Sequence, residues 1–222
     1  MELREQRFGI EIEMTGITRA GAAKVAATYF GTRSEYVGTY YQTYAAVDQE
    51  GRQWKFMSDG SIRAEKKVNG EKRAAGAVYR TEMVSPICRY EDIEKIQELI
   101  RELKKKGAIV NESCGIHVHI DASPFDAGKL RNLTNIMAAK EDLIYKALGV
   151  SVERQHRWCR PVEERFLEEL NRRRPTSMEA VEEIWYNGRS RRGQHYDQSR
   201  YHCLNLHSVF QKGTVEFRLF NG

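Results

Sequence analysis

The sequence predicts an α+β fold in which a mostly antiparallel, curved sheet has one polar face and helices packed on the other. Three stretches alternate apolar residues with ionisable ones: Gly9–Glu13, Gly115–Ile120 and Val215–Phe220. A period of two indicates strands, because successive side chains point to opposite faces. A small-residue stretch, Arg19–Phe30, and an amphipathic one, Tyr90–Lys106, have the composition and spacing of helices that pack on a sheet.

Each of the three strands places its ionisable side chains on one face and its apolar side chains on the other. If the strands share one sheet, its polar face carries three carboxylates, two imidazoles and one guanidinium. Solvent-facing strands more often carry Lys, Thr, Ser and Gln, so this composition indicates a functional face. The ionisable side chains are those of Glu11, Glu13, His117, His119, Glu216 and Arg218.

The overall composition is that of a soluble globular protein. The 222 residues are 41% hydrophobic and 30% charged, and the net charge is +5. No apolar run is long enough to cross a membrane, and the N-terminus has no apolar signal region. The four cysteines stand far apart without a CxxC pair, so we expect reduced thiols and a cytoplasmic protein.

The positive charge permits binding to nucleic acid or nucleotide phosphates without requiring it. The densest basic stretch, Ser151–Arg200, holds eleven arginines and nine acidic residues, an excess of 11 − 9 = +2. Such a balance is typical of a solvated, salt-bridged helical surface, and we do not expect a nucleic-acid partner.

The first half of the chain is predicted to contain two hairpins. A tyrosine-rich strand, Tyr36–Val47, is followed by a returning strand, Arg52–Met57. A second hairpin pairs Ile62–Val68 with Ala77–Val84 and closes near Asn69-Gly70, a strong turn dipeptide.

Two carboxylates in this half are open to two interpretations. Asp59 lies in the Ser58–Ser61 loop between the hairpins, and such a loop is usually only a turn. Glu82 lies among apolar residues near the end of a predicted strand, where an edge carboxylate facing solvent is the simpler explanation.

The second half is predicted to contain three helices, a polar loop and a final hairpin. The first helix has Ser123 as its N-cap and runs to Leu148, and the other two are Pro161–Leu170 and Ser177–Tyr186. The polar loop is Asn187–Arg200. The final hairpin pairs Tyr201–Val209 with Thr214–Phe220.

The polar strands suit metal binding. Carboxylates two residues apart on a strand stand about 6–7 Å apart, which suits neighbouring divalent cations. An oxygen-rich site with imidazole favours Mg²⁺ or Mn²⁺ over Zn²⁺. Glu-x-Glu or His-x-His alone is a weak signal, and their joint occurrence is stronger. Arg218 either pairs with a neighbouring carboxylate or stabilises charge on a phosphoryl or acyl group. No Walker motif and no GxGxxG occurs.

Six short motifs resemble, in the same order, those of the amidoligase family. That family belongs to the carboxylate–amine ligase superfamily of glutamine synthetase and glutamate–cysteine ligase. The motifs are Phe8–Glu13, Ser58–Ser61, Thr81–Pro86, Ser113–His119, Leu204–Leu206 and Val215–Arg218, so the resemblance spans nearly the whole chain.

The resemblance implies a glutamine synthetase-like catalytic sheet that binds ATP and Mg²⁺ (or Mn²⁺) and joins a carboxylate to an amine through an acyl phosphate. The substrates would be an amino acid, peptide or protein. The implied roles are as follows: Glu11, His117 and Glu216 on the metal at the ATP phosphates; Glu13 and Glu82 on the metal nearer the acyl substrate; Arg218 at the transferring phosphoryl group; His119 and Asn205 in the nucleotide or substrate pocket; Arg200 at a phosphate; and Asp59 binding and deprotonating the amine.

Family members continue beyond the Glu-x-Arg strand into a C-terminal helical segment, whereas this sequence stops at Gly222. We therefore expect a single catalytic domain, residues 1–222, that lacks this segment, and a homo-oligomer stays open. Two other functions also stay open: a metal-dependent hydrolase using the same polar face, and a non-catalytic basic binding module.

Overall fold

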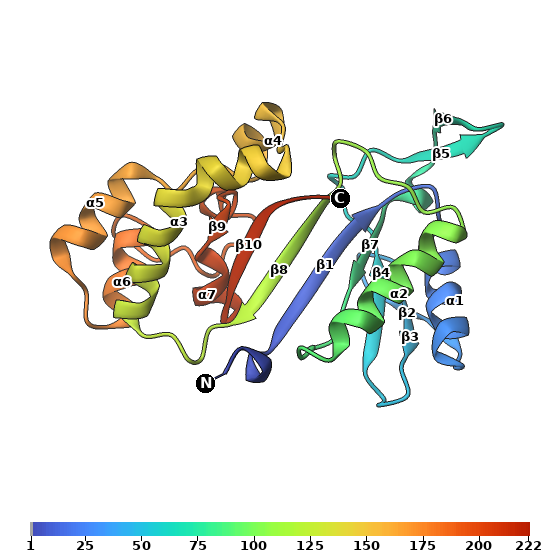
Figure 1. The fold of residues 1–222 in the computed structure, drawn as a ribbon, viewed down its shortest axis with the longest axis horizontal. Coiled ribbons are helices and arrows are strands. Elements are labelled where there is room, and N and C mark those ends of the chain that lie inside the picture. The colour runs from blue at the N-terminus through green and yellow to red at the C-terminus, as the bar shows by residue number, and fades with distance from the viewer. Residues whose placement is uncertain (1) are drawn as a thin grey trace. The chain divides into compact units, whose positions relative to one another are not determined.

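The computed structural model describes residues 2–222, and the chain divides into two compact units. The first comprises Met1–Ile116 with Asn221–Gly222, and the second comprises His117–Phe220. Each unit combines antiparallel strands with helices, so the predicted α+β class is confirmed (Figure 1). Within residues 2–222, no helix combines the length and apolar character that crossing a membrane requires.

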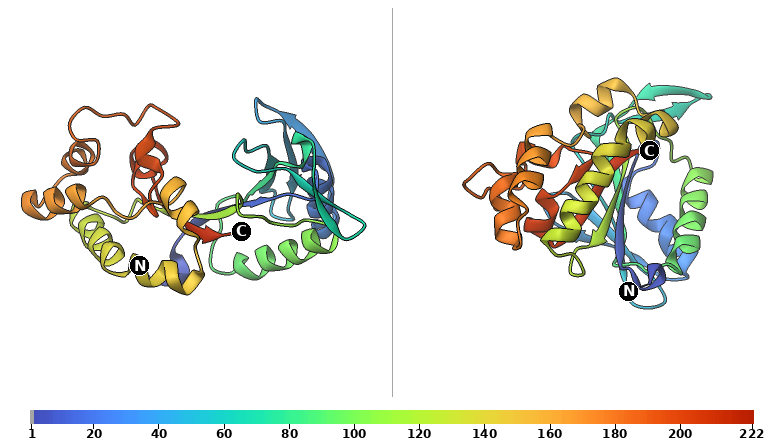
Figure 2. Two further views of the ribbon diagram at one scale, coloured as in Figure 1. Left: turned by 90° about the horizontal axis from the view of Figure 1, so that it is seen from above. Right: turned by 60° about the vertical axis from the view of Figure 1, so that its left-hand side comes forward.

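The first unit contains five antiparallel strands that are hydrogen-bonded in the order β2-β3-β4-β7-β1. Its strands are β1 (Phe8–Met14), β2 (Ser34–Gly38), β3 (Thr43–Val47), β4 (Gln53–Met57) and β7 (Thr81–Val84). Its helices are α1 (Arg19–Phe30) and α2 (Asp92–Lys105), with short 3-10 turns η1 (Leu3–Glu5) and η2 (Ala77–Tyr79). A separate hairpin, β5 (Glu65–Val68) with β6 (Glu71–Ala74), projects from this unit (Figure 2).

Helix α1 matches the predicted range and packs on the sheet through its small residues. Thr18 caps its start by accepting a hydrogen bond from the Gly21 amide, and Gly31 ends it in the left-handed conformation. Ala22 and Ala26 are fully buried against large sheet residues such as Trp54. Alanines allow close approach of helix and sheet, so this core is dense.

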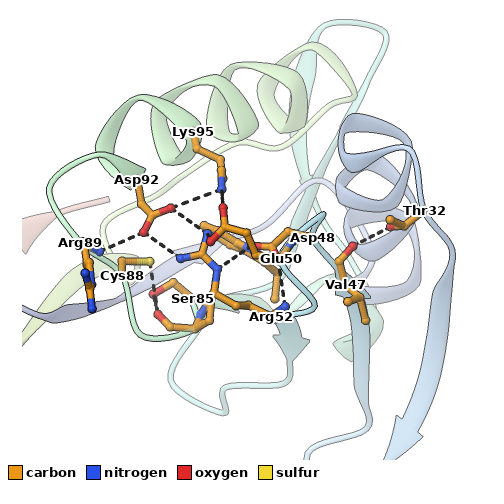
Figure 3. A network of polar contacts seen from close by, with 12 residues as sticks. Thr32, Val47, Asp48, Glu50, Arg52, Ser85, Cys88, Arg89, Asp92 and Lys95 are labelled. Carbon is orange, nitrogen blue, oxygen red and sulfur yellow. Dashed lines mark hydrogen bonds and ion pairs between the residues drawn. The ribbon is translucent and has the colours of Figure 1, made fainter.

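A network of charged side chains fastens the β3–β4 turn to the start of α2 (Figure 3). Arg52 donates from Nε to Asp48 at 2.9 Å and from both Nη atoms to Asp92 at 2.8 and 2.7 Å. Lys95 reaches Asp92 at 3.3 Å, and Trp54 Nε1 donates to Asp48 at 3.1 Å. Bidentate pairing of this kind fixes geometry as well as charge.

The second unit carries strands in the order β8-β10-β9, with four helices inserted between β8 and β9 (Figure 1). The strands are β8 (Gly115–Asp121, which begins in the first unit), β9 (Leu204–Asn205) and β10 (Thr214–Asn221). The helices are α3 (Ala127–Leu148), α4 (Val152–Arg157), α5 (Glu164–Arg173), α6 (Met178–Trp185) and α7 (His207–Lys212), with a 3-10 turn η3 (Gln198–Arg200). Leu130, Phe166 and Val215 belong to their shared apolar core.

Three predictions differ from the structure in detail: the strand over Tyr36–Val47, the partner strands of the second hairpin, and the residue that caps helix α3. The strand expected over Tyr36–Val47 is broken by a turn in which Thr39 and Gln42 have positive φ. The turn near Asn69-Gly70 is present, but it joins β5 to β6, and β7 pairs with β1 and β4 instead. Helix α3 is capped by Asp126, whose side chain accepts from the Lys129 amide, and not by Ser123.

The predicted final hairpin is correct in its pairing and wrong in its length. Asn205 lies opposite Glu216 across antiparallel β9 and β10. The expected strand over Tyr201–Val209 has only two strand residues, and its end belongs to helix α7, which Gly213 terminates in the left-handed conformation. The segment 202–209 is buried throughout, so alternation along it carries no information on which side faces the core.

Candidate functional site

Three carboxylates converge in the first unit. Glu13 on β1 lies directly opposite Glu82 on β7, and Asp59 follows β4, the strand that places Met57 opposite Glu82. One oxygen from each of the three lies within 4.8 Å of the others. Glu13 and Glu82 are buried, with exposed fractions of 4% and 8%. The solvent-facing interpretation of Glu82 is therefore wrong.

Local hydrogen bonds orient two of these carboxylates. Oδ1 of Asp59 accepts from the Ser61 amide at 2.6 Å and from the Ser61 hydroxyl at 2.5 Å. Oε2 of Glu13 accepts from the Gly115 amide at 2.6 Å. The loop that carries Asp59 is in turn tied to the β2–β3 turn, because the Ser58 amide donates to the Tyr41 carbonyl at 2.9 Å.

The cluster has the donor chemistry of a hard-cation site. Buried carboxylates this close together repel one another, and burial removes the water that would screen them. A divalent cation offsets that repulsion, and an all-oxygen donor set is the kind that Mg²⁺ and Mn²⁺ prefer. Glu13, Asp59 and Glu82 therefore fit the predicted cofactor.

Glu11 lies on the same strand as Glu13, two residues before it, so the two side chains leave the same face of β1. It is half-buried and lies opposite Val84.

In the second unit, Glu216 on β10 is the centre of a buried polar group. Its Oε2 accepts a hydrogen bond from the side-chain Nδ2 of Asn205 at 2.6 Å, and its Oε1 accepts one from Nη1 of Arg218 at 2.5 Å. Nδ1 of His117 lies 3.8 Å from Oε1, and Nε2 of His119 lies 3.7 Å from it. All five of these predicted residues are buried, and the structure brings them together.

His119 is oriented from its other side by two hydroxyls that the sequence analysis did not single out. Its Nδ1 lies 3.0 Å from Oγ1 of Thr214 and 3.5 Å from Oγ of Ser208, and the two hydroxyls are 2.8 Å apart. This arrangement places Nε2 toward Glu216. The alternation of β10 contains a signal for Thr214, since residues 214, 216 and 218 share a face. No sequence pattern indicates Ser208.

Arg218 and Arg200 both contact the ring of Tyr201. The guanidinium carbons lie 5.8 and 5.7 Å from the ring centroid. Arg218 also approaches the Trp158 carbonyl, with Nε at 3.4 Å, and Trp158 packs edge-on against Tyr201. Arg200, in η3, donates to the His195 carbonyl at 2.9 Å. Tyr201 is thus a shared aromatic support that the sequence analysis missed.

A pocket of about 770 Å³ lies elsewhere in the second unit, lined by α5, α6 and the segment 198–202. It contains none of the predicted site residues. Its arginines are engaged with protein groups, for example Arg173 with Glu183 at 3.2 Å and Arg191 with Asp197 at 2.8 Å. We therefore keep the ionisable strand residues, and not this pocket, as the candidate site.

Comparisons with known proteins identify a family and no individual relative. No curated protein and no solved structure matches this chain at a significant level. A family model described as "Putative amidoligase enzyme" matches residues 4–222, which is nearly the entire chain and includes every candidate residue above. This protein belongs to the amidoligase family.

Proposed function

We propose that this protein is an ATP-dependent ligase that joins a carboxylate to an amine through an acyl phosphate. Family membership over residues 4–222 indicates a ligase that forms amide bonds. The observation that supports the finer proposal is the cluster of Glu13, Asp59 and Glu82, whose oxygens lie within 4.8 Å of one another. Its two buried glutamates suit a divalent cation of the kind that accompanies ATP in phosphoryl transfer, and Asp59 lies beside them.

The metal ligands in this proposal are five residues. Glu13 and Glu82 hold the ion nearer the acyl substrate. Glu11, His117 and Glu216 hold the ion at the ATP phosphates; this second set rests on the family resemblance. When bound, Mg²⁺ or Mn²⁺ neutralises phosphate charge and aligns the phosphate with its acceptor.

The reaction has two balanced steps. In the first, a carboxylate oxygen of the acid substrate attacks the γ-phosphorus of ATP, the bond to the β-phosphate oxygen breaks, and ADP leaves. In the second, the amine nitrogen attacks the acyl carbon, inorganic phosphate leaves, and the nitrogen gives up a proton. Arg218 stabilises the phosphoryl group during transfer, since a buried guanidinium is a strong partner for phosphate oxygens.

Asp59 takes the proton from the amine. Both hydrogen bonds from Ser61 reach Oδ1, so Oδ2 is the oxygen available to the incoming nitrogen. Half-burial keeps this carboxylate at the edge of the cluster, where an amine reaches it from solvent.

Asn205, His119 and Arg200 serve the nucleotide side. The side-chain nitrogen of Asn205 donates to Glu216, while its Oδ1 is buried and has no hydrogen-bond partner within residues 2–222. A buried acceptor of this kind favours a ligand that donates an N–H or O–H group. Arg200 supplies a positive charge for phosphate.

The proposal is tested by measuring ADP and phosphate release with a panel of acids and amines, in the presence of Mg²⁺. We expect release that requires both an acid and an amine, and that Glu13→Gln reduces at least about a hundredfold, as for loss of a metal ligand. Glu35→Gln, at an exposed position on β2, is the matched control and keeps full activity. Substrate turnover without ATP would instead indicate a hydrolase.

A further inference from the structure

We propose that a second site in the first unit, built around Arg19, binds a small-molecule carboxylate that carries an apolar or aromatic part. The site is a pocket of about 380 Å³ at the start of α1. It is lined by Thr18, Arg19, Ala20, Tyr36, Gln42 and Tyr44, among others. None of these residues belongs to the candidate metal ligands. The volume is within the range of about 300–1,000 Å³ that is usual for small-molecule sites.

Arg19 is a buried cation without an acidic counter-ion. The residue is 4% exposed, and within residues 2–222 no carboxylate forms an ion pair with it. Its three hydrogen bonds all go to neutral oxygens: Nη1 donates to the carbonyls of Ala77 at 2.9 Å and Arg80 at 3.0 Å, and Nη2 donates to Gln42 at 2.5 Å. Its Nε is buried and has no hydrogen-bond partner among the residues that the structure describes.

An unneutralised buried guanidinium is costly, and an anion is the group that offsets the cost. Burial lowers the pKa of Arg19, which reports the same desolvation. The first turn of α1 adds to the positive potential, because the amide groups at the start of a helix favour negative charge.

Gln42 occupies the position that we assign to the ligand's carboxylate. Its Oε1 accepts from Nη2, and among residues 2–222 the neighbouring Nε has no partner, so Gln42 alone occupies the Nε–Nη2 edge of the guanidinium. That edge matches a carboxylate in bidentate geometry. Gln42 is exposed and lies in the β2–β3 turn, so its side chain swings away without disturbing the core.

Two tyrosines indicate the rest of the ligand. The rings of Tyr36 and Tyr44 lie side by side across β2 and β3, with centroids 4.9 Å apart. Tyr36 is 59% exposed, which is high for an aromatic side chain that lines a pocket. A flat or apolar ligand body covers such rings and gains from their burial.

Resting on the proposed function, this pocket holds a second carboxylate of the acid substrate, away from the carboxylate that reacts. Two backbone links connect the surroundings of the pocket to the carboxylate cluster within the same unit. Arg80, whose carbonyl binds Arg19, directly precedes β7 and lies two residues before Glu82 in the chain. The Tyr41 carbonyl, in the turn that carries Gln42, binds the Ser58 amide beside Asp59.

The test compares two probes of the same shape, 3-phenylpropanoate and the neutral 3-phenylpropanamide, by titration calorimetry of the full chain without ATP or metal. We expect the acid to bind at least about tenfold more tightly than the amide, as for a hydrogen-bonded charge. Gln42→Glu supplies an internal carboxylate to Arg19 and is expected to weaken acid binding at least about tenfold. Gln42→Ala removes the competitor and is expected to bind the acid at least as tightly as the unaltered protein.

Tyr36→Ala is expected to weaken both probes, and Tyr40→Ala, at a 92% exposed residue outside the pocket lining, leaves both unchanged. All four variants alter exposed or half-exposed positions, so folding does not decide the result. The proposed site is overturned by any of three results: equal binding of acid and amide, no binding of either, or an affinity of Gln42→Glu for the acid that equals that of the unaltered protein. Because nothing here requires ATP, failure of the pocket and failure of the ligase activity are separate outcomes.

Discussion

At the scale of single residues, Glu216 and Arg218 form a buried charge pair that the proposed function uses. They are two residues apart on β10 and 1% and 5% exposed, and Nη1 of Arg218 donates to Oε1 of Glu216 at 2.5 Å. The other carboxylate oxygen is held by Asn205 at 2.6 Å. These hydrogen bonds hold both side chains in place, as the electrostatic role proposed for Arg218 requires.

The pair predicts a measurable coupling. Arg218→Gln or Glu216→Gln alone leaves its partner buried and poorly compensated, and each is expected to lower the free energy of unfolding by about 3–5 kcal/mol. The double variant is expected to cost less than the sum, with a coupling of about 1–3 kcal/mol. Urea unfolding of the four proteins at neutral pH measures this coupling, and additive costs would contradict the pairing.

Asp92 gives the stability a defined pH dependence. Hydrogen bonds from Arg52 are the largest cause that lowers its pKa well below the ordinary value, and burial opposes them. Because the folded-state pKa is the lower one, the stabilisation is fully present above the unfolded-state pKa of about 3.9. It is lost as the pH falls further toward the folded-state pKa.

We therefore expect the free energy of unfolding to decline as the pH is lowered from about 5 toward 2. Asp92→Asn is expected to flatten this decline and to cost about 2 kcal/mol at neutral pH, by loss of charged hydrogen bonds. Asp126→Asn, at an exposed helix cap, is a control that leaves most of the decline in place. An unchanged slope in Asp92→Asn would contradict the assignment.

At the scale of elements, close contact between two loops of the first unit depends on Gly16. This residue has a φ of +80°, and a Cβ there would lie 2.4 Å from the Gly107 carbonyl oxygen. The contact joins the end of β1 to the end of α2, and it continues in paired hydrogen bonds between Thr15 and Ile109 at 2.8 Å. The glycine thus lets the helix return close to the strand.

Gly16→Ala is expected to destabilise the protein far more than Gly51→Ala. Gly51 has nearly the same φ, +79°, with no atom within 4 Å of an added Cβ. The backbone penalty of about 1–2 kcal/mol is common to both, so the difference isolates the clash with Gly107. Thermal unfolding of the two variants provides the measurement, and equal shifts in melting temperature would show that the loops yield easily.

The elements that sequence predicts well are those whose signal is local. The period of two identifies β1, β8 and β10, and Thr18 with Gly31 delimits α1. The Asn69-Gly70 turn is likewise local and present. The choice of partner for β7 is not local: its neighbours β1 and β4 come from distant parts of the chain, and no pattern within residues 77–84 specifies them.

The residues of the candidate site likewise divide into those that local sequence patterns predict and those that they do not. Glu13, Glu216 and Arg218 are predictable because alternation sets their faces, and Asp59 and Asn205 enter through the family resemblance. Ser208, near His119, lies on the short helix α7 within a segment buried on all sides, where periodicity is uninformative. The role of Tyr201 could not be predicted from the sequence either, because its contacts with Arg200 and Arg218 arise from tertiary packing.

At the scale of the whole molecule, each of the two compact units contains its own set of candidate catalytic residues. The first has the carboxylates Glu13, Asp59 and Glu82, and the second has Glu216 with its imidazole and guanidinium partners. In the proposed function both sets serve one reaction, because the family model covers residues 4–222 and so includes both of them. Loss of activity is therefore expected from substitution in either unit.

Trapping with hydroxylamine tests the central claim most directly. The protein is incubated with ATP, Mg²⁺, hydroxylamine and a mixture of carboxylic acids, and hydroxamate and ADP are measured together. The account predicts hydroxamate formed in equal amount with ADP, dependent on both ATP and acid, and lost in Glu13→Gln and in Arg218→Gln. Hydroxamate formed without ATP, or ADP release that is independent of the acid, would contradict it.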